Sequence, residues 1–493
     1  MPEPTNNYQW QTLDRDLNRF SRVEYATNYV SRPLVGVGVS LVFIVLATLA
    51  AALIIGREPG SLIVIAAAAF GAYMALNIGA NDVANNMGPA VGANALSMFG
   101  AIAIAAIFES AGALLAGGDV VSTISKGIID PSSVATTRVF VWAMMSALLS
   151  AAIWVNLATW IGAPVSTTHS VVGGVMGAGV AAAGFGAVQW GTMGAIAASW
   201  VISPLLGGII AAAMLAFIKS RIIYAEDKIA AARKWVPVLI GLMTAAFATY
   251  LALKGLKHLF EVTMGQALLI GAGLGLGSWL VAIPLIRRQS RGLENRNRSL
   301  KVLFAFPLVA SAALLSFAHG ANDVANAVGP LAAIVHAQHF GAAAGEVVIP
   351  MWVMVIGAFG ISFGLILFGP KLIRMVGNQI TKLNPMRAYC VSLSAALTVI
   401  LASWLGLPVS STHIAVGGVF GVGFYREWYM EKRARSSAQA RPTVPGHAAE
   451  ERRRRKLVRR SHFMTIIAAW VITVPAAALM SALMFLLLGG LLG

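Results

Sequence analysis

The same string of seven small and polar residues occurs twice in this chain, each time inside apolar surroundings. Gly-Ala-Asn-Asp-Val-Ala-Asn occupies Gly79–Asn85 and recurs at Gly320–Asn326. An ionised aspartate at membrane depth costs at least about 2.5–3.5 kcal/mol, so it is normally paired or functional. Carboxylate, amide and backbone oxygens form a hard ligand set that suits a small cation such as sodium. The candidate cation ligands are Asn81, Asp82, Asn85, Asn322, Asp323 and Asn326, with Asp82 and Asp323 as the charged sodium ligands.

The residue types within each copy predict its local structure. If the copies are helical, the two asparagines of each share one face and the aspartate lies beside that face. Gly79 and Gly320, together with the Gly-Pro pairs at 88–89 and 329–330, predict a break in each helix that exposes backbone amides and carbonyls. A polar contact between two helices is the alternative, and the duplication of the whole string argues against it.

A second matched pair of segments carries consecutive hydroxyl side chains. Pro-Val-Ser-Thr-Thr-His spans Pro164–His169, and Pro-Val-Ser-Ser-Thr-His spans Pro408–His413. Proline followed by serine or threonine is typical of a helix start, where free N–H groups and the helix dipole favour an anion. Plain helix capping is the alternative role. The candidate oxyanion donors are Ser166, Thr167, Thr168, Ser410, Ser411 and Thr412.

Basic side chains are missing from the ranges that hold these motifs. No Lys or Arg occurs in 58–125, 139–218, 302–370 or 388–425. An oxyanion bound there would have no basic side chain to neutralise it, and the two aspartates add negative charge. Since unpaired charge at low dielectric is strongly unfavourable, bound cations or protons must balance it. The motifs therefore favour cation-coupled anion symport.

Three of the other ionisable side chains in these ranges, Glu109, His169 and His413, are candidates for a role in coupling. Glu109 lies in the middle of the apolar run 99–117, and its rough counterpart in the second half is Gly360. It is either a coupling acid that takes up a proton or a hydrogen-bonded structural acid. His169 and His413 follow the hydroxyl runs, and we expect them to be neutral structural residues rather than proton relays.

The elements that position these motifs are membrane helices. The chain has 493 residues, of which 58% are hydrophobic and 11% charged, and its mean hydropathy is +0.77. Its net charge of +17 comes from basic residues in short loops between apolar runs, which indicates membrane topology rather than nucleic-acid binding. The single cysteine, Cys390, excludes a disulfide framework within the chain and a cysteine metal cluster.

About thirteen apolar runs are long enough to cross a bilayer. The basic loops between them place the N-terminus in the cytoplasm of a protein in the cell (cytoplasmic) membrane. The predicted organisation is a cytoplasmic segment at 1–33, an additional helix and loop at 34–60, a first repeat at 61–218, a linker with two helices at 219–300, and a second repeat at 301–492 that includes a basic cytoplasmic loop at 425–462.

The number of crossings sets the orientation of the two repeats. About five crossings in the first repeat plus two in the linker is an odd number, so the second repeat enters the membrane in the opposite sense. The predicted fold is an all-α polytopic membrane protein with two inverted repeats of about five transmembrane helices each. The runs 163–183 and 408–424 are rich in Gly and Ser, and we expect broken or re-entrant segments there, at the substrate site.

The duplicated GANDVAN string with its Gly-Pro pair, together with PVS(T/S)TH in both halves, resembles the inorganic phosphate transporter (Pit) family of sodium- and proton-coupled phosphate symporters. The resemblance covers most of 61–492. It implies symport of inorganic phosphate, with coupling cations bound by the first motif and phosphate bound by the Ser/Thr run. Glu109 resembles a glutamate that is important for transport in sodium-coupled members.

The resemblance also bears on coupling and partners. GAND is intact in both halves, which is closer to the sodium-coupled members than to the proton-coupled enteric permeases. The expected partners are inorganic phosphate and the lipid bilayer, with sodium ions or protons as co-transported ions and no other cofactor. A homodimer is compatible with the sequence.

Other functions remain open at this point. A sulfate or other oxyanion permease of the same fold, or a proton-coupled (metal-)phosphate symporter, would use the same motifs. An aspartyl protease could use two membrane aspartates, but it would not need matched asparagine-rich strings or hydroxyl runs. A passive anion channel usually selects its ion with rings of basic residues, which the motif ranges lack. We therefore predict a transporter and not an enzyme.

Overall fold

A computed structural model describes residues 34–56, 60–161, 165–255, 261–342, 345, 347–379, 383–438 and 460–492. Within these ranges the chain is helical apart from short connections and one isolated β-bridge, between Ile129 and Val188. Eleven of the helices are long and apolar enough to cross a membrane. The expected all-α polytopic membrane fold is confirmed. The predicted segment 1–33 and the middle of the predicted loop 425–462 lie outside the described residues.

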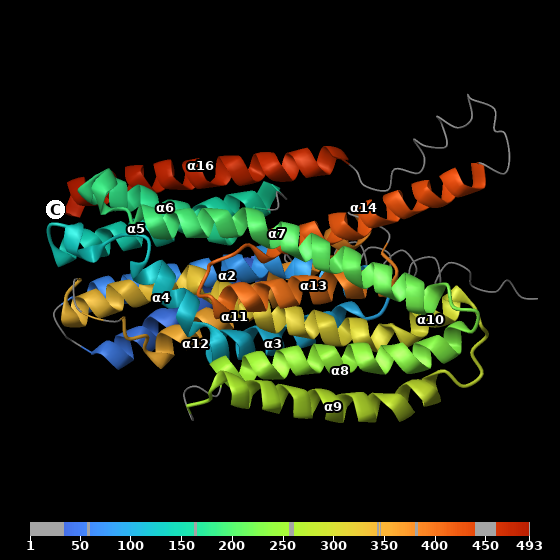
Figure 1. Ribbon diagram of the computed structural model, residues 1–493. Helices are drawn as coiled ribbons and strands as arrows, with labels where there is room; N and C mark the ends of the chain where they lie inside the picture. The colour runs from blue at the N-terminus through green and yellow to red at the C-terminus, as the bar shows by residue number, and fades with distance from the viewer. Residues whose placement is uncertain are drawn as a thin grey trace, which may run out of the picture.

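Most helices run roughly along one common direction (Figure 1). The first part of the chain forms the helix Leu34–Ile55, α2 (Ser61–Gly92), α3 (Met98–Ala116), α4 (Gly118–Lys126), α5 (Thr137–Ile161), α6 (Thr167–Ala183) and α7 (Trp190–Ile218). A hairpin of α8 (Lys228–Lys254) and α9 (Met264–Gln289) follows. The remainder forms α10 (Asn297–Leu303), α11 (Ala305–Phe340), α12 (Met351–Gln379), α13 (Pro385–Trp404), α14 (Ser411–Ala438) and α16 (Arg460–Leu492).

The eleven candidate spans replace the roughly thirteen crossings predicted. The two runs that do not qualify as spans are 163–183 and 408–424, which contain the hydroxyl motifs. They belong to α6 and α14, each of which packs beside the helix that precedes it, α5 and α13 respectively. In Figure 1, α6 and α14 start near the middle of the molecule and extend toward opposite ends. Each hydroxyl run therefore starts a helix inside the bundle.

The predicted helix breaks at the Gly-Pro pairs are wrong. Both α2 and α11 continue without interruption through Pro89 and Pro330. The glycine of each string serves close packing instead: a Cβ on Gly79 would overlap the carbonyl of Ile361 in α12, and a Cβ on Gly320 would overlap the carbonyl of Glu109 in α3. Membrane bundles tolerate proline in spanning helices and use small residues to bring backbones together, so helix-breaking propensity misled the prediction.

Helices from the two parts of the chain pack mainly on each other. The main partner of α2 is α12. Helix α11 packs against α3 and also against α13. Likewise α6 packs on α16, and α14 packs on α7. The two parts of the chain therefore interlock, and both contribute to the middle of the bundle.

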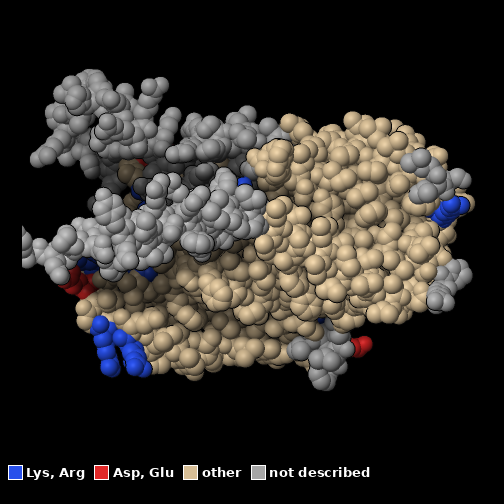
Figure 2. Space-filling view, turned by 180° about the vertical axis from the view of Figure 1, so that it is seen from behind, with Lys and Arg blue, Asp and Glu red and all other residues tan. Residues whose placement is uncertain are grey.

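The face of the bundle seen in Figure 2 is largely apolar between its two ends. Figure 2 shows a wide area without Lys, Arg, Asp or Glu, and the Lys and Arg side chains seen in this view lie mainly toward one end. Large apolar side chains such as Leu269 and Val281 of α9 and Leu205 of α7 are exposed. Such a surface suits contact with lipid tails rather than water.

Candidate functional site

Asp82 lies in the buried part of α2 and contacts the starts of both α6 and α14. Its Oδ2 accepts a hydrogen bond from Thr167 Oγ1 at 2.7 Å, and its Oδ1 accepts one from Thr412 Oγ1 at 3.1 Å. Asn85 Nδ2 donates to the same Thr412 hydroxyl at 2.8 Å. Asn81 Nδ2, in the amide orientation that satisfies both ends of its side chain, lies 3.2 Å from Asp82 Oδ1. In the first copy, hydroxyl and amide donors therefore surround the aspartate carboxylate.

Asp323, in the second copy, has different neighbours. Its Oδ2 lies 2.8 Å from Nε2 of His319, one turn earlier in α11. Its Oδ1 is buried without a hydrogen-bond partner, and so are Asn326 Oδ1 and Ser411 Oγ. Ser411 holds the place in its motif that Thr167 holds in the first motif. The hydroxyl-to-carboxylate bond of the first copy is thus not formed in the second, which leaves buried oxygen atoms available to a cation.

Asparagines of the second string bind the start of α6, the last turn of α13 and the segment that joins α13 to α14. Asn326 Nδ2 donates to Thr167 Oγ1 at 3.3 Å and to Thr168 Oγ1 at 3.2 Å. Asn322 Nδ2 donates to Ser403 Oγ at 2.9 Å, and its Oδ1 accepts from the backbone N–H of Val409 at 3.2 Å. Together with the contacts of Asn81 and Asn85, these bonds place the four asparagines of the two strings in one buried region with the hydroxyl motifs.

Two carboxylates and one imidazole meet at the centre of this region. One ligand atom from each of Asp82, His319 and Asp323 lies within 4.8 Å of the others, and all three side chains are buried. Carboxylates this close repel each other strongly at low dielectric. In the part of the chain that the structure describes, the ion-pair partner of Asp323 is His319, with no Lys or Arg. A bound cation or a protonated His319 would supply the balancing charge.

Glu109 extends this cluster away from the two aspartates. Its Oε2 lies 2.5 Å from His319 Nδ1, and its Oε1 accepts from Asn86 Nδ2 at 2.8 Å. His319 therefore bridges Glu109 on α3 and Asp323 on α11, using one ring nitrogen for each. The arrangement can hold one proton between two acids, or position both acids while a cation binds elsewhere.

The starts of α6 and α14 touch each other. Ser166 Oγ accepts from the backbone N–H of His169 at 3.2 Å, and Ser410 Oγ accepts from that of His413 at 3.3 Å, as N-cap residues do. The Thr168 hydroxyl donates to the carbonyl of Val409 at 3.0 Å. The His169 and His413 rings lie 4.6 Å apart. The predicted helix starts are confirmed, while phosphate binding by these buried hydroxyls stays a prediction.

Many of these contacts join matching positions of the two parts. Asn85 binds Thr412, and Asn326 binds Thr168, which is the reciprocal pair. His169 contacts His413, its own counterpart. Such reciprocal and self-matching contacts are what a two-fold arrangement of equivalent segments produces.

Close packing at glycine identifies one more matching pair. A Cβ on Gly112 would overlap the carbonyl of Phe317, and one on Gly364 would overlap the carbonyl of Leu76. Both carbonyls precede their strings by the same interval, so α3 and α12 align with Ser110 opposite Ser362, whose hydroxyls lie 2.7 Å apart. This alignment equates Glu109 with Ile361 rather than with Gly360, the rough counterpart that we predicted. The acid is therefore a feature of one half alone.

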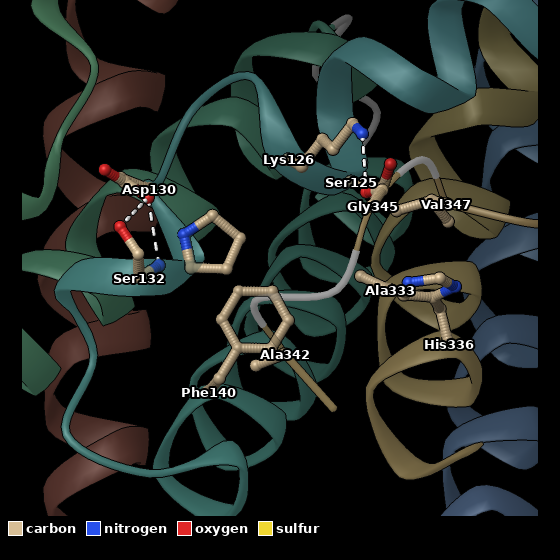
Figure 3. Close-up of a pocket in the computed structure, with 11 residues that line it drawn as sticks. Ser125, Lys126, Asp130, Ser132, Phe140, Ala333, His336, Ala342, Gly345 and Val347 are labelled. Carbon is tan, nitrogen blue, oxygen red and sulfur yellow. Dashed lines mark hydrogen bonds between the residues drawn. The ribbon is translucent and has the colours of Figure 1, made fainter. Parts of the chain in front are cut away.

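A pocket of about 140 Å³ lies elsewhere, beside the last turn of α4 (Figure 3). Lys126 Nζ donates to the carbonyl of Gly345 at 2.9 Å. Ser132 donates from its N–H and hydroxyl to Asp130 Oδ1, and these bonds hold the pKa of Asp130 below its ordinary value. The pocket lining includes none of the predicted site residues, so we do not assign the predicted site to it.

Sequence reasoning missed several members of the central cluster. His319, Asn86 and Ser403 were not selected, although each binds a predicted site residue. His319 carries a signal that could have been used, because Ile78 stands at the same place before the first string. A histidine in place of an isoleucine one turn before a duplicated acid is a chemical difference between the two copies that the sequence shows. Ser403 has no comparable signal.

Comparisons with known proteins give a consistent result. A family model described as "Phosphate transporter family" matches residues 78–481. A Helicobacter pylori protein named "Putative phosphate permease" is 49% identical over 440 residues, which cover 88% of this chain and 83% of that protein. The Arabidopsis thaliana "Inorganic phosphate transporter 2-1, chloroplastic" is 39% identical over 72% of this chain and 65% of its own length.

A solved structure is also similar to this chain. It is described as "The sodium-dependent phosphate transporter", and it is 35% identical in sequence with a TM-score of 0.78. The match covers 87% of this chain and 100% of that chain. The likeness therefore extends over both parts of the molecule that build the central cluster.

Proposed function

The chain belongs to the phosphate transporter family, and from that premise we propose that it is a sodium-coupled symporter of inorganic phosphate. It is a multi-pass membrane protein and a phosphate transporter, not an enzyme. Sodium as the coupling ion is our proposal. The name of the similar solved structure includes sodium dependence, which supports the choice for this chain.

The observation that carries the proposal is the buried cluster of Asp82 and Asp323. Its ligand atoms lie within 4.8 Å, and Asp323 Oδ1 has no hydrogen-bond partner. Sodium prefers oxygen ligands of this kind and would neutralise charge that no Lys or Arg balances. We propose that sodium binds at the Asp323 side, where Ser411 Oγ and Asn326 Oδ1 are further candidate ligands.

Phosphate would bind after the two hydroxyl motifs separate. In the structure Thr167 and Thr412 donate to Asp82, and Thr168 donates to Val409. Because ligand atoms of Asp82 and Asp323 lie within 4.8 Å of each other, sodium bound at the Asp323 side would also attract the Asp82 carboxylate. The carboxylate would then hold these hydroxyls less strongly, so they could donate to phosphate oxygens instead. The helix starts of α6 and α14 would add N–H groups and favourable dipole ends.

We further propose that the two parts are inverted repeats in the cytoplasmic membrane, with the N-terminus in the cytoplasm. If the α5–α6 and α13–α14 hairpins do not cross the bilayer, five of the candidate spans run from α2 to α9 before α11 begins. That odd number makes α11 enter in the opposite sense to α2. The reciprocal contacts between the halves support this arrangement.

Transport can be tested in proteoliposomes that contain the purified protein. We expect labelled phosphate to accumulate when an inward sodium gradient is imposed, and not when choline replaces sodium. Excess sulfate should compete weakly if phosphate is the substrate. Accumulation that is independent of sodium but collapses with a protonophore would reject sodium coupling and leave phosphate transport standing.

Topology can be tested with single cysteines after Cys390, which is buried, has been replaced. Gly186→Cys lies in the connection between α6 and α7, and Arg298→Cys replaces an exposed residue in α10. An impermeant thiol reagent added to intact cells should label the first and not the second. The reverse pattern would overturn the proposed orientation.

Proton coupling is a second candidate because His319 bridges two buried acids. Its ring nitrogens lie 2.5 Å from Glu109 and 2.8 Å from Asp323, which is a suitable arrangement for a transferable proton. In the same proteoliposomes, a pH gradient without sodium would then drive uptake. His319→Gln should abolish that proton-driven uptake and spare sodium-driven uptake if both modes exist.

A further inference from the structure

Three basic side chains from three helices lie together at the end of the bundle where α7 leads into α8. Lys219 directly follows α7, Arg387 lies in the first turn of α13, and Arg426 lies in α14. All three are half-buried, and α7 packs on both other helices. Arg387 and Arg426 both act electrostatically on Lys219, and Arg426 acts on Arg387. The three positive charges are therefore close enough to repel one another.

Within the described residues, no ion pair joins an acidic side chain to this group. Among the described residues, the ion pairs join Lys254 to Asp119, Arg296 to Glu294, and His319 to its two carboxylates, so none includes Lys219, Arg387 or Arg426. Glu427 is next to Arg426 in sequence, but adjacent helix residues point in different directions.

The surroundings of Lys219 are aromatic instead. Its Nζ lies 4.3 Å from the ring centroid of Tyr429 and 5.1 Å from that of Tyr425. The Tyr429 ring stacks on the Tyr224 ring with their centroids 5.5 Å apart, so this aromatic contact holds Tyr429 beside Lys219. These rings hold the ammonium in place through cation–π attraction without removing its charge.

Helix ends do not remove the excess charge either. The carboxyl end of α7 offers about half a negative charge, and the amino end of α13 about half a positive charge, so the two roughly cancel. Asn384 caps α13 by accepting from the backbone N–H of Arg387 at 3.0 Å. An excess of roughly three positive charges in a half-buried site is mutually repulsive, and a bound anion would relieve that repulsion.

We propose that Lys219, Arg387 and Arg426 form a second binding site, for a phosphate group, at this end of the protein. Guanidinium groups match phosphate oxygens with paired N–H donors, and the ammonium adds a point charge. The phosphate group can belong to the headgroup of an anionic phospholipid or to a free phosphate ion. In the proposed topology this end faces the cytoplasm, where anionic lipids attract basic side chains. The site does not depend on sodium coupling.

The test compares two variants that lose the same charge. The cluster variant is K219Q/R387Q/R426Q, and the matched control is R287Q/R288Q/K301Q, whose residues are exposed. Thermal unfolding of the full-length proteins is followed in phosphatidylcholine nanodiscs, with and without phosphatidylglycerol. A parallel series adds inorganic phosphate in choline buffer at constant ionic strength. Any binding at the central site is common to both variants, so the difference between them reports the second site.

If the proposal is right, phosphatidylglycerol or inorganic phosphate raises the unfolding temperature of the wild type and the control but not of the cluster variant. A response to the lipid alone assigns the headgroup, and a response to phosphate alone assigns the free ion. Arg387→Gln by itself should weaken the apparent affinity about tenfold, and Arg387→Lys should weaken it less. These single variants serve if the triple variant does not fold. Equal responses of cluster variant and control to both ligands would overturn the proposal.

Discussion

The two copies of the seven-residue string are identical, yet their aspartates have different surroundings. Asp82 accepts hydrogen bonds from Thr167 and Thr412, one from each hydroxyl motif. Asp323 has His319 on one oxygen and no hydrogen-bond partner on the other. The difference teaches that a repeated motif need not perform the same task twice. Here the first aspartate holds the hydroxyl motifs, and the second is the better candidate for binding a cation.

The cause of this difference lies just outside the string. His319 replaces the Ile78 of the first copy, and Glu109, which binds His319, stands where the other half has Ile361. One half thus carries an acid–imidazole pair that the other lacks. The two aspartates therefore differ in their charged neighbours, although matching glycines bring backbones together in both halves.

The largest expected effect comes from neutralising the aspartates. Asp323→Asn should reduce sodium-driven phosphate uptake by at least the roughly 10–100-fold that loss of an outer-shell metal partner costs. It should also lower the unfolding temperature, because Asp323 Oδ2 loses its buried ion pair with His319. Asp82→Asn should reduce uptake and also lower the unfolding temperature, since its bonds to the threonines weaken. Normal uptake by either purified variant would remove that residue from the site.

Binding of sodium and phosphate should be mutually dependent. If no basic side chain compensates the anion, sodium should tighten phosphate binding, and phosphate should tighten sodium binding by the same factor, about 5–150-fold. Calorimetric titration of the purified protein with phosphate, in sodium and in choline at equal ionic strength, measures this factor. We expect Asp323→Asn to remove it. Equal phosphate affinity in both buffers would exclude sodium as the balancing ion.

Variants at the matching hydroxyl residues Thr167 and Ser411 should differ in their free energy of unfolding. Thr167→Val removes a donor to the Asp82 carboxylate and should lower the free energy of unfolding by about 1.5–3 kcal/mol. Ser411→Ala removes a hydroxyl that has no hydrogen-bond partner, so it should leave stability unchanged while weakening sodium binding. Thr167→Ser keeps the donor and serves as the control. Equal destabilisation by Thr167→Val and Ser411→Ala would mean that the copies do not differ in this way.

The glycines should show where the copies are equivalent. Gly79→Ala and Gly320→Ala each place a Cβ on a backbone carbonyl, so both should destabilise the protein by about 1–3 kcal/mol or more. Gly277→Ala, which meets no atom within 4 Å, should change little. Thermal unfolding of the three variants in one detergent measures this. A small effect at one string glycine beside a large effect at the other would show that the packing is asymmetric as well.

Much of the fold follows from local features of the sequence. The apolar runs predicted the spanning helices, because each run reflects the solvent around one segment. The Ser166 and Ser410 caps were predicted as helix starts, because capping depends on residues within a few positions. The breaks at Pro89 and Pro330 were predicted from equally local rules, and there the surrounding bundle outweighed the propensity.

By itself the sequence determined the membrane class, the duplicated acids and hydroxyls, and the absence of Lys and Arg around them, because composition and repetition can be counted along the chain. Only the tertiary structure decided which acid meets which partner. Thr412 reaches Asp82 across 330 positions, and His319 reaches Glu109 across 210. Such contacts depend on how helices cross, and the crossings depend on backbone approach at glycines of both halves at once, which no local pattern records.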